Sequence, residues 1–315
     1  MMMGKVNLAG RRGARKISGW LVIDKPAGMT SAAVVGRVRR ATGAAKAGHG
    51  GTLDPLATGL LPLALGEATK TVNYVMEGRK VYRFTVRWGE QRDTDDADGQ
   101  IVARSDLRPT RNEIVALLDR FQGDIEQVPP TYSAIKVSGE RAYALARTDQ
   151  PVELAARTVH VSRIGLLDCP SADFSIFEVE AGKGVYMRAL ARDLGTALGC
   201  LGHVVALRRL SVGPFTESQA ISLEMLELVG HSEDLKTYLL PVGSALAGIP
   251  ALSVTEAEAN SLQRGQPIAA LPVASRSPST QVSRDVVVCT MARGKAVALA
   301  QIKGGEIHPL RILNY

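Results

Sequence analysis

The sequence lacks the features that mark secreted, membrane-spanning or disulfide-stabilised proteins. It has three cysteines in 315 residues, and their odd number and spacing fit neither a disulfide framework nor a zinc site. Its densest apolar run, residues 60–65, contains a proline and is far shorter than the roughly 20 apolar residues of a membrane span. The basic N-terminus is not followed by an apolar segment, as a secretory signal would be. We therefore expect a cytoplasmic protein without membrane contacts.

Patterns typical of bound metals and nucleotide cofactors are also missing. The five histidines are scattered without an HxxxH pair, and residues 182–184 (Gly-Lys-Gly) lack the third glycine of a dinucleotide-binding loop. The aspartates of residues 93–98 are similar to a calcium loop, but Arg104 stands where that loop needs a glutamate. We expect neither a metal nor a cofactor.

Positive charge is concentrated at the N-terminus. Residues 1–16 contain five basic side chains and no acidic one, whereas the whole chain has a net charge of +7. The rest of the chain is therefore close to neutral and does not indicate its partner by charge. A basic arm of this kind is either an RNA-binding segment or a solubilising extension, and the sequence favours neither.

Hydrophobic periodicity divides the remainder into an α+β body, residues 17–245, and a small β-rich region, residues 246–315. The total length is typical of about two domains. In the body, the pattern predicts strands at residues 20–24, 81–88, 132–137, 158–167, 174–180 and 204–212. It predicts helices at residues 30–42, 67–76, 110–121 and 186–198. In the second region, it predicts a helix at 257–264, an irregular segment at 271–283, and strands at 286–291, 296–302 and 308–312.

One glycine-rich segment carries the clearest chemical signal. It reads Gly48-His-Gly-Gly-Thr-Leu-Asp-Pro-Leu-Ala-Thr-Gly59, and its composition predicts an irregular loop with a single acid, Asp54. A lone aspartate in a tight loop works as a nucleophile or as a single base. The alternative is a structural Asx-type turn before Pro55, and the residues alone favour that simpler interpretation.

Further motifs follow this loop in a fixed order along residues 19–215. They are Asp24-Lys-Pro26, Gly66-Glu-Ala-Thr-Lys70, Lys80-Val-Tyr-Arg83, Asp93-Thr94 with Asp98-Gly99, Pro129-Pro-Thr-Tyr-Ser-Ala-Ile-Lys136, Gly184-Val-Tyr-Met-Arg188 and Leu207-Arg-Arg209. Together with the glycine-rich loop, this series closely resembles the bacterial TruB-type tRNA pseudouridine synthases.

The resemblance implies an enzyme that isomerises uridine 55 in the T-loop of tRNA to pseudouridine. The base is detached from C1′ of its ribose, rotated, and rejoined through carbon 5. The resemblance also implies a mixed, mainly antiparallel sheet flanked by helices, a C-terminal PUA-like domain, and no cofactor or metal. The expected partner is the T-stem-loop of tRNA, with no obligate protein partner and a monomeric chain.

Three residues match the catalytic positions of that family. Asp54 matches the aspartate that acts on the sugar, and an ionised carboxylate in a closed pocket needs a neighbouring cation. Arg188 matches the arginine that pairs with it; otherwise it is a solvated helix residue. Tyr82 matches the tyrosine that stacks on the target base; otherwise it is a core aromatic beside Phe84 and Trp88.

The resemblance assigns supporting roles to five more residues. His49 matches the histidine that enters the space left by the flipped nucleotide. Tyr186 and Leu207 match residues that line the uracil pocket, although ordinary core packing would also explain them. Lys25 and Pro26 match a motif that supports the active loop and is structural rather than catalytic.

Two other functions stay open at this point. A ribosomal-RNA pseudouridine synthase is disfavoured because its active loop reads more like Arg-Leu-Asp, whereas this chain has Thr52-Leu-Asp54 before Pro55. A catalytically silent tRNA-binding or tRNA-folding protein is disfavoured because binding alone does not require Asp54, Tyr82 and Arg188 as a set.

The basic arm gives the first testable prediction. If residues 1–16 contact RNA, each neutralised phosphate contributes about 0.7 to 0.9 to the slope of log affinity against log salt, so five charges contribute roughly 3.5 on the lower coefficient. If only some of these charges engage phosphates, deletion of residues 1–16 should flatten that slope by about 1 to 2 without changing turnover at saturating tRNA. Binding of full-length and truncated protein is measured at several salt concentrations. An identical slope for both proteins would show that the arm does not touch RNA.

Overall fold

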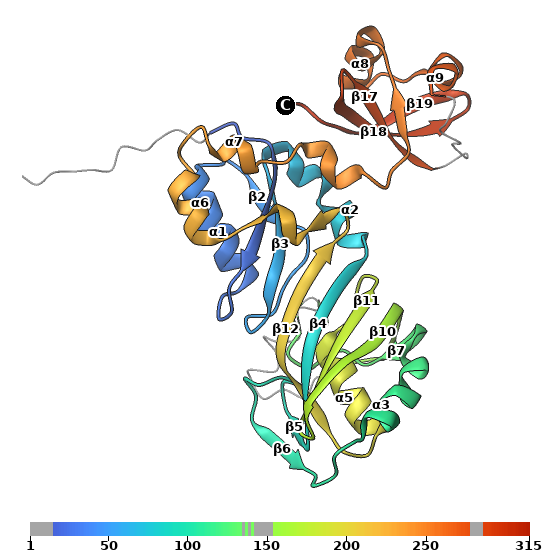
Figure 1. The fold of residues 1–315 in the computed structure, drawn as a ribbon. Coiled ribbons are helices and arrows are strands. Elements are labelled where there is room, and N and C mark those ends of the chain that lie inside the picture. The colour runs from blue at the N-terminus through green and yellow to red at the C-terminus, as the bar shows by residue number, and fades with distance from the viewer. Residues whose placement is uncertain (1–14, 134–135, 138–139, 142–153, 278–285) are drawn as a thin grey trace, which may run out of the picture.

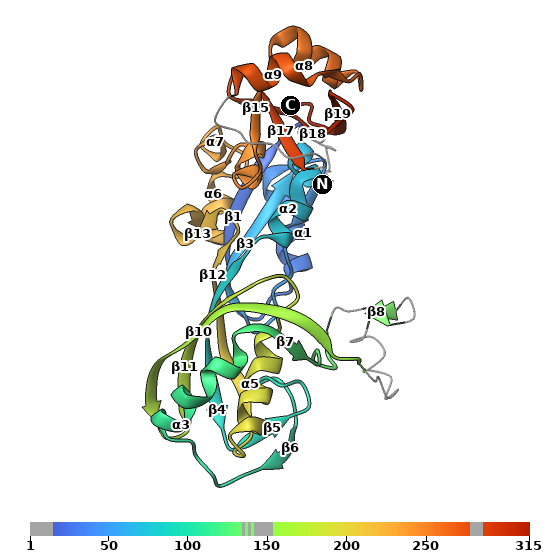
Figure 2. The same ribbon diagram turned by 90° about the vertical axis from the view of Figure 1, so that its right-hand side faces the viewer.

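The structure is a computed structural model that describes residues 15–133, 136–137, 140–141, 154–277 and 286–315. The molecule is elongated, with a long twisted sheet through its body and a smaller C-terminal sheet at one end (Figure 1). Strands β4 (Lys80–Trp88) and β12 (Gly202–Val212) lie side by side and join the two halves of the long sheet (Figures 1 and 2). The functional pocket described below lies beside these two strands.

The long sheet has ten strands and is mixed but mainly antiparallel, which confirms the expected α+β class. Its order is β14-β1-β3-β12-β4-β11-β10-β7, with β2 paired to β3 and β13 paired to β12. Only the β1–β14 and β3–β12 pairs are parallel within it. The other strands are β1 (Gly19–Lys25), β2 (Ala47–His49), β3 (Thr58–Leu65), β7 (Gly123–Gln127), β10 (Arg157–Ser171), β11 (Phe174–Ala181), β13 (Phe215–Thr216) and β14 (Ala220–Ile221).

Strand β1 shows how this sheet is buried on both faces. Its alternate residues enter two different cores: Leu21 and Ile23 pack on the face that α1 covers, and Trp20 and Val22 pack on the other. Helix α1 (Ser31–Thr42) begins as predicted, because the side chain of Thr30 accepts a hydrogen bond from the Ala33 amide. The first core also includes apolar residues of α5 (Met187–Ala197), which confirms the helix predicted at residues 186–198.

Shorter elements complete the body. The helices are α2 (Val72–Glu77), α3 (Arg111–Leu117), α6 (Leu223–Val229) and α7 (Leu235–Tyr238), and the 3-10 helices are Gly66–Thr71, Leu118–Phe121, Glu217–Gln219 and Val242–Leu246. Two small hairpins pair β5 (Glu90–Arg92) with β6 (Ile101–Arg104), and β8 (Lys136–Val137) with β9 (Glu140–Arg141). The strand predicted at 132–137 is wrong at its start, since Tyr132 and Ser133 are not in a strand, and residues 134–135 lie outside the described part.

The segment predicted to be irregular over residues 48–59 holds the ends of two strands. Strand β2 ends at His49, and β3 begins at Thr58, so the irregular part is only residues 50–57. Pro62 has no N–H to donate, but β3 tolerates it because Pro62 lies just beyond the last pair between β2 and β3, His49 with Leu63. Its carbonyl is still used, since it accepts a hydrogen bond from the Gly50 amide at 2.8 Å.

The C-terminal region forms a second sheet, which confirms the β-rich, PUA-like expectation. Its order is β15-β17-β18-β19-β16, and it is accompanied by helix α8 (Glu256–Gln263). Residues 270–276 form helix α9, so the prediction of an irregular segment there is wrong. The strands are β15 (Ala251–Ser253), β16 (Ile268–Ala269), β17 (Val287–Ala292), β18 (Lys295–Lys303) and β19 (Glu306–Ile312).

The C-terminal sheet is fixed to the body by a shared core and by polar contacts. Cys289 and Leu299 pack in the same cluster as Trp20 of the body. The ammonium of Lys70 donates to the carbonyl of Ile312 at 2.8 Å, and Glu67 accepts from the amide of Asn314 at 2.8 Å. The motif Gly66–Lys70 therefore serves as the attachment point of the C-terminal strand.

The N-terminal arm lies mostly outside the described residues. Of its five basic side chains, only Arg15 and Lys16 are described. Arg15 packs on the body, where its guanidinium donates to the carbonyls of Gly230 at 3.1 Å and Thr42 at 3.4 Å. None of the helices in the described ranges combines the length and the apolar composition needed to cross a bilayer.

Gly59, at the start of β3, yields a prediction about stability. It has φ +96°, and a Cβ there would lie 2.3 Å from the carbonyl oxygen of Arg209 in the neighbouring strand. Gly59→Ala should lower the free energy of unfolding by at least about 2 kcal/mol, because the left-handed backbone and the clash add. Urea unfolding measures this loss. Gly123→Ala is the matched control, since Gly123 has φ +79° but no atom within 4 Å of the new Cβ. Equal losses for both would contradict the close approach to Arg209.

Candidate active site

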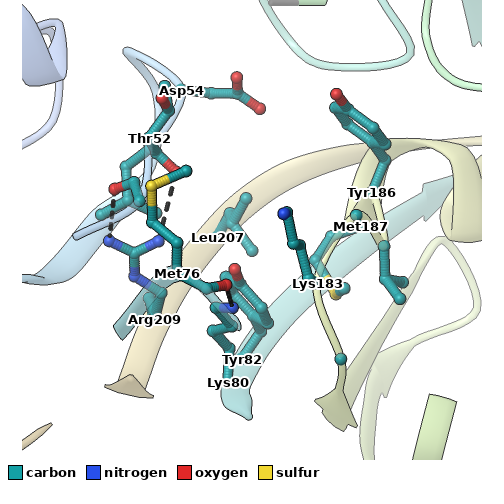
Figure 3. Close-up of a pocket in the computed structure, with 15 residues that line it drawn as sticks. Thr52, Asp54, Met76, Lys80, Tyr82, Lys183, Tyr186, Met187, Leu207 and Arg209 are labelled. Atoms are coloured by element: carbon teal, nitrogen blue, oxygen red, sulfur yellow. Dashed lines mark hydrogen bonds between the residues drawn. The ribbon is translucent and has the colours of Figure 1, made fainter. Parts of the chain in front are cut away.

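A pocket of about 250 Å³ opens where the glycine-rich loop meets β4 and β12 (Figure 3). Asp54 points into it from the loop, Tyr82 and Lys80 line it from β4, and Tyr186 borders it on the far side. The remaining lining residues are Gly51, Thr52, Leu53, Met76, Gly182, Lys183, Gly184, Val185, Met187, Leu207 and Arg209. Segments far apart in the sequence therefore build one cavity.

Hydrogen bonds on both sides of Asp54 hold the loop. The hydroxyl of Ser31, at the start of α1, accepts from the amide of Leu53 at 2.8 Å and donates to its carbonyl at 3.0 Å. On the other side, the carbonyl of Pro55 accepts from the Lys25 ammonium at 3.1 Å and from the Gly28 amide at 2.8 Å. These bonds fix the backbone that carries the carboxylate.

Arg188 is the cation that Asp54 requires. Its Nε donates to Asp54 Oδ2 at 2.9 Å, and its two other nitrogens donate to the carbonyls of Thr94 at 3.0 Å and Tyr132 at 2.9 Å. The Arg188 side chain is 4% exposed and that of Asp54 is 31% exposed, so the arginine lies behind the carboxylate and leaves it open to the pocket. A charge-assisted hydrogen bond of this kind orients the carboxylate toward the pocket.

A second acid faces the same arginine from the opposite side. Asp96 Oδ2 lies 3.4 Å from Arg188 Nη1, and the hydroxyl of Thr94 donates to Asp96 Oδ1 at 2.6 Å. One turn along α5, Arg192 donates to Asp95 at 2.9 Å. Burial raises the pKa of Asp96, and it raises that of Asp95 to about 6. The aspartates that were similar to a calcium loop thus hold two arginines of α5.

The two tyrosines are positioned by different means. Tyr82 is half-buried on the same face of β4 as Phe84 and Trp88, which are both 1% exposed. One face of β4 therefore contributes both core aromatics and a wall of the pocket, which is compatible with both sequence interpretations of Tyr82. Tyr186 is held through its backbone by the buried Gln127, whose amide accepts from the Tyr186 N–H at 2.8 Å and donates to its carbonyl at 3.2 Å. Burial is the main cause of the raised pKa of Tyr186, and the charge of Asp54 adds to it.

Two buried cations on the other side of the loop bind only backbone carbonyls among the described residues. Arg209 is 1% exposed, and its guanidinium donates to Leu60 at 2.8 Å, Gly51 at 3.1 Å and Thr52 at 3.2 Å. Lys25 is fully buried and donates to three carbonyls, including that of Pro55. Burial lowers the pKa of Lys25 to about 8, although the charge of Asp54 opposes this shift. Both cations shape the loop and leave a positive potential around Asp54.

The structure brings together most of the residues selected from the sequence. Asp54, Tyr82, Tyr186 and Leu207 line the pocket, and Arg188 lies directly behind it. Three others are outside the lining. Lys25 lies beneath the loop, Pro26 is exposed beside it, and His49 is half-buried at the end of β2, where its Nδ1 accepts from the Gly51 amide at 3.4 Å.

Sequence reasoning assigned no role to several residues that complete the site. They are Met76, Lys80, Asp96, Gln127, Lys183 and Arg209. Lys80 and Arg209 belong to quoted motifs, which was the one available signal. In the described ranges, no group of three or more His, Cys, Asp or Glu side chains is arranged to hold a metal ion.

Comparison with known proteins identifies the class to which this fold and pocket belong. A solved structure of a Cbf5-Nop10-Gar1 complex shares the fold, with a TM-score of 0.72 and 25% identity over 94% of this chain and 85% of that chain. A family model described as TruB family pseudouridylate synthase (N terminal domain) matches residues 39–187. A second, described as tRNA pseudouridylate synthase B C-terminal domain, matches residues 188–247. The chain is a pseudouridylate synthase by class.

Full-length relatives identify the family. The tRNA pseudouridine synthase B of Rhodospirillum rubrum is 56% identical, over 96% of this chain and 99% of that protein. The protein of the same name from Bradyrhizobium diazoefficiens is 53% identical, over 96% of this chain and 88% of its own length. The chain belongs to the TruB family of pseudouridylate synthases.

Arg188 provides the prediction for this site. Arg188→Leu should lower the single-turnover rate by about 100-fold or more, because Asp54 loses the donor that orients it. It should also lower the free energy of unfolding by about 3 kcal/mol, since Asp96 is left buried without its cation. Arg188→Lys keeps the charge but cannot reach Asp54 and both carbonyls together, so it should recover stability more than rate. Full activity of the Leu variant would contradict the assigned pairing.

Proposed function

We propose that this pocket takes up uridine 55 from the T-loop of tRNA and isomerises it to pseudouridine. The observation that carries the proposal is the Asp54–Arg188 pair, in which a half-exposed carboxylate faces the cavity and a buried guanidinium holds it from behind. Membership of the TruB family and the names of full-length relatives support tRNA as the substrate.

The geometry suits cleavage of an N-glycosidic bond. That reaction needs a carboxylate that attacks C1′ or stabilises the cationic sugar, and Asp54 is placed to do either. An enzyme that acts on C1′ and on the ring of a stacked base must take that base out of its stack, so the nucleotide must be flipped into the pocket. Tyr82 offers a face on which the base can stack, and Leu207 supplies an apolar wall.

The chemistry then requires the base to turn within the pocket before it is rejoined. The electron pair of the C1′–N1 bond stays on the detached uracil, which rotates and attacks C1′ through carbon 5. Loss of the carbon-5 proton and gain of a proton at N1 complete an isomerisation that needs no external reagent. Apolar walls with few fixed hydrogen bonds permit this rotation, and Leu207, Val185 and Met187 are of that kind.

The site also argues against the two alternatives. A silent tRNA-folding protein would not need Asp54 and Arg188 paired beside Tyr82 in one pocket. The ribosomal-RNA group is disfavoured by Thr52 and Pro55 around Leu53-Asp54 and by the similarity to tRNA enzymes over the whole chain.

The remaining parts of the assignment extend the same proposal. His49 would occupy the space left by the flipped nucleotide, as it lies at the rim of the loop. The C-terminal part, residues 246–315, would contact tRNA away from the T-loop. We propose that the protein acts in the cytoplasm as a monomer, without an obligate protein partner, a metal or a cofactor.

Asp54→Asn tests the assignment directly. The variant should lose pseudouridine formation while its affinity for tRNA stays within about threefold, because phosphate contacts elsewhere supply most of the affinity. Pseudouridine is mapped in tRNA after incubation with each purified protein, and binding is measured in parallel. Substantial product from the pure Asn variant would rule out Asp54 as the group that acts on C1′. Product at another position would rule out uridine 55 as the target.

A further inference from the structure

Lys80 is a buried cation on the wall of the pocket that the mechanism above does not use. It is the first residue of β4, two residues before Tyr82, and so its side chain projects from the same face of the sheet. It lies between Ala181 of β11 and Val212 of β12 in the register of the sheet. The residue is 5% exposed, yet it contributes to the pocket lining together with Tyr82 and Arg209 (Figure 3).

The ammonium of Lys80 has more N–H donors than acceptors among the described residues. It can donate three hydrogen bonds, and within the described residues its one acceptor is the carbonyl of Met76. No carboxylate of the described residues lies within ion-pair distance of it. Glu77, whose charge partly opposes the lowering of the Lys80 pKa, is already bound to Lys183. Burying an ammonium without a full set of acceptors raises the free energy of the folded state, so the presence of Lys80 in this wall requires an explanation.

The neighbouring cations differ from Lys80 in this respect. Lys25 has three N–H groups and three carbonyl acceptors, so its donors are all used. Each of the three nitrogens of Arg209 also has a carbonyl acceptor, one in β3 and two in the loop. Burial, with a further contribution from the charge of Arg209, lowers the pKa of Lys80 to about 8, so the ammonium is still charged at neutral pH. Of these three buried cations, Lys80 has the fewest acceptors among the described residues, one for three N–H groups, and it lines the pocket.

We propose that Lys80 is a catalytic residue whose ammonium donates a hydrogen bond to a carbonyl oxygen of the detached uracil and stabilises its negative charge. The inference rests on the proposed function. When the C1′–N1 bond breaks heterolytically, its electron pair stays on the base and is shared among N1, O2 and O4. Lys80 transfers no proton in this step. The charge disappears when the same base forms its carbon-5 bond to C1′, so the ammonium favours the intermediate over both substrate and product.

Lys80→Met tests this role, because it keeps the length of the side chain and removes the charge. The single-turnover rate of uridine 55 conversion at saturating enzyme should fall by about 100-fold, as expected when a donor to a developing anion is removed. The affinity for tRNA should stay within about threefold. Arg83→Met is the matched control. It removes one positive charge from the same strand, but Arg83 is exposed on the opposite face and paired with Glu178, so its rate should not change.

A second substrate separates electrostatic stabilisation from a merely structural role. Fluorine at carbon 5 lowers the basicity of the detached uracil anion. Cleavage of the N-glycosidic bond of 5-fluorouridine at position 55 therefore depends less on stabilisation by the ammonium. The defect of Lys80→Met should therefore shrink to about tenfold or less on the fluorinated tRNA, measured as loss of the N-glycosidic nucleoside. Lys80→Gln, which keeps a donor but no charge, receives the same comparison if the Met variant does not fold.

The outcomes distinguish this inference from the proposed function. If the wild-type protein fails to convert uridine 55, the proposed function is wrong. If the wild type is active, three results would overturn the role of Lys80: an unchanged rate in the variants, an equal defect on both substrates, or a loss of tRNA affinity as large as the loss of rate. The last result would make Lys80 a phosphate contact.

Discussion

The buried guanidinium of Arg188 connects three segments that lie far apart in the sequence. It binds the carboxylate of Asp54, the carbonyl of Thr94 and the carbonyl of Tyr132, and it comes from helix α5, which packs in the main core. An arginine can do this because its planar group carries donors in three directions, and burial makes each bond stronger and each missing bond more costly. The position of Asp54 thus depends on the packing of α5, and the core sets the geometry of the site.

The far side of the loop is also held by buried cations, but these bind backbone carbonyls and no carboxylate among the described residues. Arg209 holds residues before Asp54, and Lys25 holds the residue after it. Because carbonyls only partly compensate a full charge, this side stays electropositive in a low-dielectric interior. Asp54 pairs with one arginine in a region with an excess of cations. Such a site would favour the negative charge that develops on the base in the proposed reaction.

The sequence predicted the elements whose local patterns are strong. Helix α1 has a capping threonine and an apolar stripe, and β4 alternates, so both were placed within a residue or two. Strand β3 was missed because it is buried on both faces, which gives a continuous apolar run instead of an alternation. Asp54 and Arg188 were found through a family motif, since no local pattern links residues so far apart. Arg209 was missed because its partners are backbone carbonyls, which leave no trace in residue identity.

The motif Gly66–Lys70 shows why a sequence match near a site need not belong to its chemistry. Glu67 and Lys70 bind each other and the chain around Ile312, while Val75, nearby on α2, packs in the core that includes Cys289 and Leu299. The same core contains Trp20 and Val22 of β1, whose alternate residues Leu21 and Ile23 pack toward α1. Strand β1 therefore packs on one face toward α1, whose Ser31 holds the loop of Asp54, and on the other face in the core shared with the C-terminal sheet. Because packed interiors deform little, the orientation of that sheet and the geometry of the active loop are set together.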